Sequence, residues 1–165
     1  MATQLDIYSG ETGDGRFNII GDSKDERSRL LSNFANTPIF LHGEYFASME
    51  GFIQGIKYQH GTQERWRTFM LVGKRAKLMS PEISQPFVWW KETQLQYGGH
   101  AHQNLIKKAL HKKFMQNNDC CDALISTGAL ILTHNTGTPE SPYTSLPSHV
   151  FCDFLTQLRR RLRKP

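Results

Sequence analysis

Three polar side chains recur at helical spacing between Glu50 and Lys57. Glu50, Gln54 and Lys57 stand at i, i+4 and i+7, which places a carboxylate, an amide and an ammonium group on one stripe of a helix. A carboxylate can stabilise positive charge or deprotonate water, and a lysine can bind phosphate or attack an aldehyde. The alternative is an ordinary solvated helix face, which spaced Glu and Lys residues usually form.

The element that must position these groups is an amphipathic helix over residues 48–57. Ser48 is of the residue type preferred at helix N-caps. Apolar residues recur at i, i+3, i+4 and i+7 as a stripe for the core: Met49, Phe52, Ile53 and Ile56. Gly51 and Gly55 lie inside this helix, where each costs roughly 1 kcal/mol relative to alanine. They therefore indicate the close approach of another backbone element, or of a bulky ligand beside Glu50.

The helix and the loop before it resemble the NADAR or YbiA-like domains. These domains carry an SNF loop, then a glycine and an aromatic residue, then a helix with the motif S-E-H-Y-F-Q-x-x-K. The corresponding residues here are Ser32, Asn33, Phe34, Gly43, Phe46, Met49, Glu50, Gly51, Phe52, Ile53, Gln54 and Lys57. Weaker similarity continues through residues 109–117 and 124–132, so the resemblance covers most of the chain.

The sequence departs from the family pattern at two places. Met49 and Gly51 stand where the helix motif has serine and histidine, which changes the wall of the expected pocket. His134, Asn135 and a Pro-, Ser- and Thr-rich loop over residues 136–148 replace the acidic residue and the D-x-x-W-G-x-G loop of the family. These departures leave the substrate open.

The resemblance implies an enzyme that cleaves N-glycosidic bonds of ribose. Family members act on early riboflavin-pathway intermediates or on ADP-ribose attached to guanine in DNA. Such cleavage passes through an oxocarbenium-like state, which the catalytic Glu50 would stabilise. Lys57 would either bind phosphate or form a Schiff base with the opened ribose, and Gln54 would orient hydroxyl groups or water. The scheme requires no metal and no cofactor.

Further candidates for substrate binding lie in the loop at residues 32–34. Ser32 opens this loop, Asn33 can donate and accept hydrogen bonds, and Phe34 either stacks on a base or fills the core. Gly51 is a further candidate for substrate binding, because it has no side chain and so leaves space beside Glu50.

Three more candidates follow later in the chain. Trp89 and Trp90 fall in a helix that Ser80 and Pro81 are expected to begin, and adjacent helical residues face about 100° apart. One tryptophan is therefore expected to line the cleft while the other packs in the core. His134 follows a predicted buried strand and is either a hydrogen-bonded scaffold residue or a substrate ligand.

The formal net charge of +5 is concentrated in two basic runs. One is the set Lys107, Lys108, Lys112 and Lys113, and the other covers residues 159–164. They are either solvated helix surface, with cations that complement a helix end, or a surface that follows a phosphate backbone. We predict the second, with ADP-ribosylated DNA or nucleotide as the partner and no obligate protein partner. Two alternatives stay open. The protein could instead cleave riboflavin-pathway intermediates, or it could be a non-catalytic module that binds ADP-ribose, nucleotide or nucleic acid.

Length and composition favour a single domain over residues 1–165, with enough hydrophobic residues (38%) to bury a core. No apolar run approaches the roughly 18 to 20 residues of a membrane span, and no signal peptide is recognised, so we expect a cytoplasmic protein. Three cysteines, two of them adjacent, suit neither a disulfide framework nor a zinc site. About six helices and three short strands are expected, which gives a mainly helical α+β domain.

The expected elements follow local sequence signals. They are a strand at residues 5–9, a hairpin at 37–46, helices from 48, from 61 to about 77, from 80, at 103–115 and at 148–163, and a strand at 129–133. A further short helix is expected to be capped by Asn118 and ended by Gly128.

Overall fold

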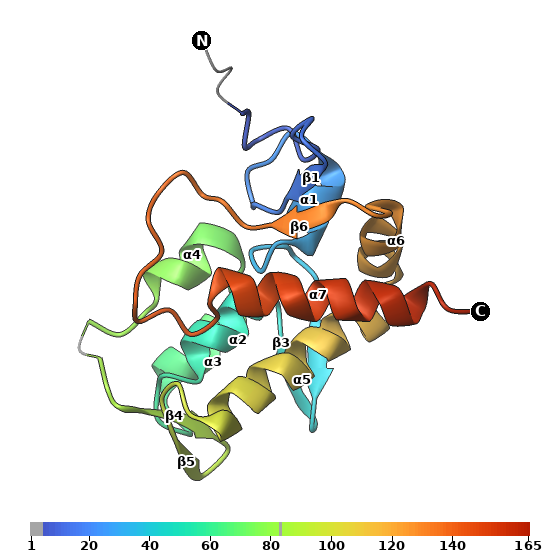
Figure 1. Ribbon diagram of the computed structural model, residues 1–165. Helices are drawn as coiled ribbons and strands as arrows, with labels where there is room; N and C mark the ends of the chain where they lie inside the picture. The colour runs from blue at the N-terminus through green and yellow to red at the C-terminus, as the bar shows by residue number, and fades with distance from the viewer. Residues whose placement is uncertain (1–4, 83) are drawn as a thin grey trace. The chain divides into compact units, whose positions relative to one another are not determined.

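The computed structural model describes residues 5–82 and 84–165 (Figure 1). The chain forms two compact units. One unit combines the described residues up to Ser32 with Asn118–Pro165, and the other is Asn33–Asn117. Both contain helices and short two-stranded sheets, so the predicted mainly helical α+β class is confirmed. The single domain over residues 1–165 stays a prediction.

The unit that holds both chain ends is built around a parallel strand pair. Its elements are β1 (Arg16–Asn18), α1 (Glu26–Leu31), α6 (Asn118–Ser126), β6 (Ile131–Thr133) and α7 (Ser148–Leu162). β1 and β6 lie side by side with Phe17 opposite Leu132. Helix α1 packs against α6, and α7 packs against β6 and α6. Buried apolar side chains, among them Phe17 and Phe151, fill this unit.

The unit Asn33–Asn117 contains the predicted central helix and two hairpins. Its elements are β2 (Ile39–Leu41), β3 (Glu44–Phe46), α2 (Met49–Gly55), α3 (Gln63–Phe69), α4 (Gly73–Leu78), β4 (Phe87–Trp90), β5 (Thr93–Gln96) and α5 (His100–Gln116). β2 pairs with β3 and β4 with β5, both antiparallel. The β2–β3 turn places His42 and Gly43 at positive φ (50° and 79°).

Helix α2 is the buried centre of this unit and packs against α3, α4 and α5. Its apolar stripe is in the core as predicted, and Phe52 meets Phe46 edge to face at 4.9 Å between ring centroids. The buried Arg65 of α3 donates to the carbonyl oxygens of Tyr58 and Trp89 at 3.0 and 2.8 Å. This guanidinium group therefore ties the turn after α2 to β4.

Several elements match the prediction. The hairpin around His42 and Gly43, the Ser48-capped helix, the strand at β6 and the helices α5, α6 and α7 are confirmed. In the described part of the chain, no helix combines the length and apolarity that a bilayer crossing needs.

Three predicted elements are wrong. Residues 5–9 form turns rather than a strand, and the first strand is β1. The helix expected to run to about residue 77 is divided into α3 and α4, because α3 ends at Phe69 and Val72, just before α4, is extended (φ −129°, ψ 160°). The helix expected from Ser80 does not form; Phe87–Trp90 is strand β4 instead. Residue 83, which that predicted helix included, lies outside the described residues.

Candidate active site

Glu50 and Gln54 form a buried hydrogen-bonded pair on α2. Ser48 caps the helix by accepting the N–H of Gly51 at 3.0 Å, which fixes the first turn and the direction of Glu50. Glu50 is only 8% exposed. Its Oε1 accepts a hydrogen bond from Nε2 of Gln54 at 2.8 Å. The predicted spacing therefore brings the two groups together, but against the interior rather than on a solvated face.

Lys57 lies in the turn directly after α2, and its ammonium group is partly desolvated. Its Nζ donates to Oγ of Ser80 at 3.4 Å and lies 5.9 Å from the centroid of the Tyr97 ring. Burial lowers the pKa of Lys57; the charge of Glu50 raises that pKa and the charge of Lys77 lowers it. A lowered pKa increases the fraction of neutral amine, which is the nucleophilic form.

Asn33 approaches Glu50 through its backbone. The Asn33 carbonyl oxygen accepts the N–H of Glu50 at 2.9 Å, so the loop that the sequence singled out does contact the helix. Oδ1 of Asn33 and Oε1 of Gln54 are buried acceptors without a hydrogen-bond partner in residues 5–82 and 84–165. Buried polar atoms are nearly always satisfied, so these two oxygens are suited to accept hydrogen bonds from a bound hydroxyl group or water.

Phe34 and Lys77 meet at the other side of this loop. Nζ of Lys77 lies 5.8 Å from the centroid of the Phe34 ring, which itself is half-buried. An aromatic face beside a cation suits a base or a phosphate group, and the prediction that Phe34 binds substrate stays a prediction.

Sequence reasoning missed four neighbours of Lys57: Lys77, Ser80, Tyr97 and His102. They come from α4, from the segment that follows it, from the end of the β4–β5 hairpin and from α5. None carries a local signal, because only the fold brings these elements to the end of α2.

His102 is a buried neutral imidazole in this cluster. Its Nδ1 accepts the N–H of Gly98 at 2.9 Å, which assigns the ring proton to Nε2. Burial, together with the smaller effect of the Lys57 charge, lowers the pKa of His102 to about 4. The ring stands 5.1 Å from that of Tyr97, so His102 holds the turn that carries the aromatic partner of Lys57.

The two helical glycines are explained by packing. A Cβ atom at Gly51 would lie 2.7 Å from the carbonyl oxygen of Leu71 and 2.9 Å from that of Thr68. A Cβ atom at Gly55 would overlap the ring of Phe69. Close approach of neighbouring segments is thus the reason for both glycines, which corrects the expectation that Gly51 leaves open space beside Glu50.

The tryptophans lie in a strand. The N–H of Trp89 donates to the carbonyl oxygen of Ile56 at 2.7 Å, which joins β4 to the end of α2. The Trp90 ring borders the aromatic core, 5.9 Å from Phe52 and 6.2 Å from Phe46 between centroids. Both rings are half-buried, and a role of either in substrate binding stays a prediction.

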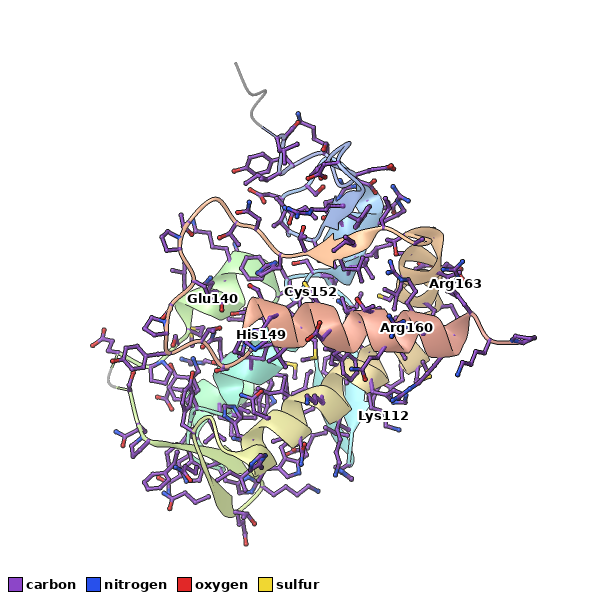
Figure 2. The ribbon with its side chains drawn as sticks, viewed as in Figure 1. Lys112, Glu140, His149, Cys152, Arg160 and Arg163 are labelled. Atoms are coloured by element: carbon purple, nitrogen blue, oxygen red, sulfur yellow. The ribbon has the colours of Figure 1, made fainter. Side chains whose placement is uncertain are left out.

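The lysine run on α5 requires one correction. Lys107, Lys108 and Lys112 are exposed, and Lys112 extends from α5 in Figure 2. Lys113 is 0% exposed, with its Nζ 5.6 Å from the centroid of the Phe114 ring. Lys113 is therefore a core residue that no nucleic-acid backbone can reach.

Ser32 and His134 belong to the other unit. Ser32 is buried and ends α1, its N–H donating to the carbonyl oxygens of Arg29 and Ser28. His134 Nδ1 donates to the carbonyl oxygen of Ile19 at 2.6 Å, and its ring packs on Phe151. These contacts fit scaffold roles, while substrate binding by either residue stays a prediction.

No metal-binding residues can be named within the described ranges, since no three His, Cys, Asp or Glu side chains gather there in a suitable group. None of the three cysteines is in a disulfide, and burial raises the pKa of Cys152 to about 12, which keeps that thiol protonated.

The fold is similar to that of the Escherichia coli protein YbiA, known from an NMR structure. The two structures superpose with a TM-score of 0.59 over 96% of this chain and 93% of YbiA, at 16% sequence identity. At that identity the likeness establishes the fold alone. The predicted resemblance to NADAR or YbiA-like domains is thus confirmed in the fold.

The chain belongs to the family of bacteriophage protein GP30.3, which it matches over residues 27–160. It is also similar to a 17.1 kDa protein of the Gp30-rIII intergenic region of Enterobacteria phage T4. The two are 29% identical over 140 residues, which is 82% of this chain and 91% of that protein.

Proposed function

We propose that the chain is an N-glycosidase, and that its substrate is ADP-ribose joined to guanine in DNA. The observation that carries the proposal is the buried Glu50, bound to Gln54, near a lysine whose pKa burial lowers. A structural salt bridge would leave Lys57 paired with a carboxylate within 4.0 Å. No such pair involves Lys57 in the described part of the chain.

Glu50 supplies the negative charge that cleavage needs. When the C1–N bond of a ribosyl group breaks, positive charge develops at C1 and the electron pair leaves with the base. A carboxylate in a poorly hydrated site stabilises that charge more strongly than one in water. Water then adds its hydroxyl group to C1, and its proton goes to the departing base, which completes the hydrolysis.

Lys57 has two possible roles on this scheme. In the first, its ammonium group holds a phosphate of the substrate and leaves the hydrolysis to Glu50. In the second, the C1–O bond of the ring opens to leave the C4 hydroxyl group, and the neutral amine of Lys57 adds to C1. The base then leaves with the electron pair of its C1–N bond and takes up a proton that the amine gives up. Water hydrolyses the resulting imine, which regenerates the lysine and leaves the sugar aldehyde. The lowered pKa of Lys57 favours the second role.

The two unsatisfied acceptors support a ribosyl ligand. Oδ1 of Asn33 and Oε1 of Gln54 are matched by the hydroxyl groups of ribose, which are donors, or by the attacking water. Both residues contact Glu50 directly, one through its backbone and one through its side chain.

Charge in the same unit supports a polymeric substrate. Lys107, Lys108 and Lys112 are exposed on α5 of the unit that contains Glu50 and Lys57. Lysines that neutralise backbone phosphates make binding fall with rising salt, because bound counterions are released on association.

The test compares two substrates in a salt series. An ADP-ribosylated oligonucleotide is scored by released ADP-ribose, and a riboflavin-pathway intermediate by released base. We expect cleavage of the oligonucleotide to fall steeply with salt, and the variant with all three exposed lysines changed to Gln to lose that salt dependence.

Preference for the riboflavin intermediate, or an equal salt response with both substrates, would show that the proposed substrate is wrong. Tight binding of ADP-ribose without any product would identify the protein as a non-catalytic module.

A further inference from the structure

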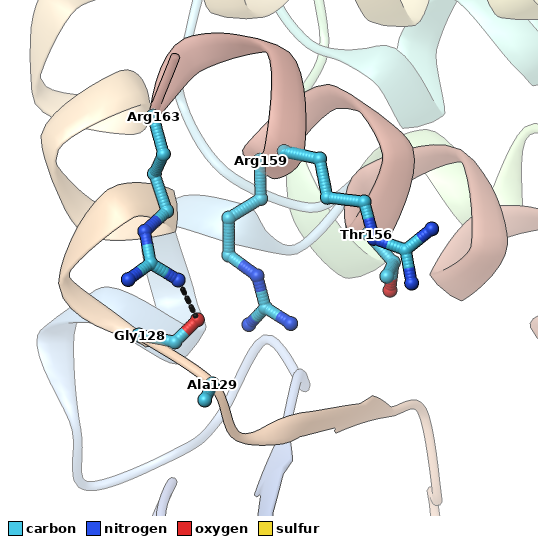
Figure 3. Close-up of a pocket in the computed structure, with 6 residues that line it drawn as sticks. Gly128, Ala129, Thr156, Arg159 and Arg163 are labelled. Atoms are coloured by element: carbon cyan, nitrogen blue, oxygen red, sulfur yellow. Dashed lines mark hydrogen bonds between the residues drawn. The ribbon is translucent and has the colours of Figure 1, made fainter. Parts of the chain in front are cut away.

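A second cluster of polar groups lies in the unit that does not contain Glu50. A pocket of about 250 Å³ opens between the C-terminal half of α7 and the turn that joins α6 to β6. It is lined by Gly128, Ala129, Thr156, Arg159, Arg160 and Arg163 (Figure 3). Arg160 and Arg163 extend from α7 in Figure 2. Three of the six lining residues are arginines, so the pocket is strongly basic.

Arg159 is buried without a carboxylate partner. The residue is 6% exposed, and its Nη1 donates to the neutral hydroxyl oxygen of Thr127 at 2.8 Å. In the part of the chain that the structure describes, none of the three arginines lies within 4.0 Å of an Asp or Glu oxygen. An unpaired buried charge is costly. Arg65, which is also buried, offsets that cost with two backbone carbonyl oxygens, whereas Arg159 has one hydroxyl oxygen.

The other two guanidinium groups retain unused donors. Arg163 donates from Nη1 to the carbonyl oxygen of Gly128 at 3.0 Å, as Figure 3 shows, which occupies one of its five N–H groups. Arg160 is exposed, and its guanidinium group forms no hydrogen bond with the described residues. Most of the fifteen or so donors of the three side chains are thus available to a ligand.

Helix ends do not neutralise this cluster. The turn at Gly128 follows α6 and the arginines lie in the last turns of α7, so both helices end near the pocket. Each C-terminus contributes roughly half a negative charge. Three guanidinium groups against two such ends leave about two positive charges uncompensated. This excess of positive charge is consistent with the lowered pKa of Arg159. Burial is the largest cause of that lowering, and the charges of Arg163 and Arg160 add to it.

We infer that Arg159, Arg160 and Arg163 form a phosphate-binding site. Guanidinium groups match the oxygens of phosphate in pairs, with two parallel N–H···O bonds from one planar fork. Gly128 and Ala129 carry little or no side chain, which lets a phosphate approach the turn closely. The phosphate is either a free or terminal phosphate of a small molecule, or a phosphodiester of a nucleic acid.

Two adjacent arginines of α7 provide a matched test. Arg160 lines the pocket and Arg161 does not, yet both are exposed and each change to Gln removes one positive charge from the same helix turn. The full chain and the variants R160Q and R161Q are titrated calorimetrically at low ionic strength. The probes are inorganic phosphate, a nucleoside 5′-monophosphate and a duplex oligonucleotide without terminal phosphates.

We expect R160Q to weaken binding of at least one probe about tenfold, the size of one lost charge-assisted hydrogen-bond pair, and R161Q to change it much less. Loss confined to inorganic phosphate and the monophosphate identifies a monoester site, and loss with the oligonucleotide identifies a phosphodiester site.

Equal losses in R160Q and R161Q would overturn the inference, because they would show that net charge rather than the pocket holds the anion. Absence of saturable binding for all three probes would overturn it as well. Neither result depends on the activity of Glu50.

Discussion

Replacement of His102 by Gln should flatten the dependence of stability on pH. His102 is fully buried and stays neutral in the folded protein down to a pKa of about 4, whereas an unfolded histidine titrates near 6.5. Between these values the unfolded chain binds the extra proton, so folding stability falls as pH falls through this window. Each pKa unit corresponds to about 1.4 kcal/mol, so the whole effect is about 3 kcal/mol.

The measurement is urea unfolding of the full chain at several pH values between about 4 and about 7. Gln keeps an oxygen that can accept the Gly98 N–H, but it does not titrate, so the variant should lose less stability at low pH than the original chain. H111Q, on the exposed face of the same helix, is the control and should keep the original profile. Parallel profiles for H102Q and the original chain would refute the reasoning.

Three further outcomes are expected. Gly51→Ala should destabilise the fold by about 1 to 3 kcal/mol in urea unfolding, because its Cβ atom would meet the Leu71 carbonyl oxygen at 2.7 Å; an unchanged midpoint would contradict the packing. Lys113→Ala should lower the unfolding free energy by about 1 to 3 kcal/mol and Lys112→Ala by less than about 0.5, because only Lys113 is buried. Borohydride during turnover should trap a sugar adduct on Lys57; full activity of Lys57→Arg without an adduct would leave only a charge role.

The central helix was predictable because its signals are local. Ser48 and the apolar spacing of Met49, Phe52 and Ile56 are sufficient to define where α2 begins and which face it buries. The pairing of Glu50 with Gln54 follows from the same spacing.

Strand β4 was not predictable from comparable signals. Ser80 and Pro81 have the composition of a helix start, and the β4–β5 turn has Lys91 and Glu92 where hairpins usually carry Asn-Gly or Asp-Gly. Lys91 nevertheless adopts a φ of 54°, which only the pairing of the two strands selects. Tertiary contacts therefore make Phe87–Trp90 a strand, although the local composition predicts a helix.

The burial of Lys113 was not predicted because lysine is a charged residue, although its position in the helix indicates the buried face. Lys113 follows Ala109 by four residues and Ile106 by seven, which places it on the buried face of α5. The neighbours of Lys57 are a different case: Lys77 and Ser80 lie at and just after the end of α4 and Tyr97 follows β5, and no spacing in the sequence relates either segment to Lys57.

The central claim, that Glu50 cleaves a ribosyl N-glycosidic bond, is tested most directly by single-turnover release of product. The original chain and Glu50→Gln are compared on the ADP-ribosylated oligonucleotide and on the riboflavin-pathway intermediate, with circular dichroism and urea unfolding to verify that the variant is folded. Gln keeps the size of the side chain and removes its negative charge. We predict release by the original chain from at least one substrate and a loss of about 100-fold or more in the variant. Near-normal release by folded Glu50→Gln, or no release from either substrate by the original chain, would contradict the account.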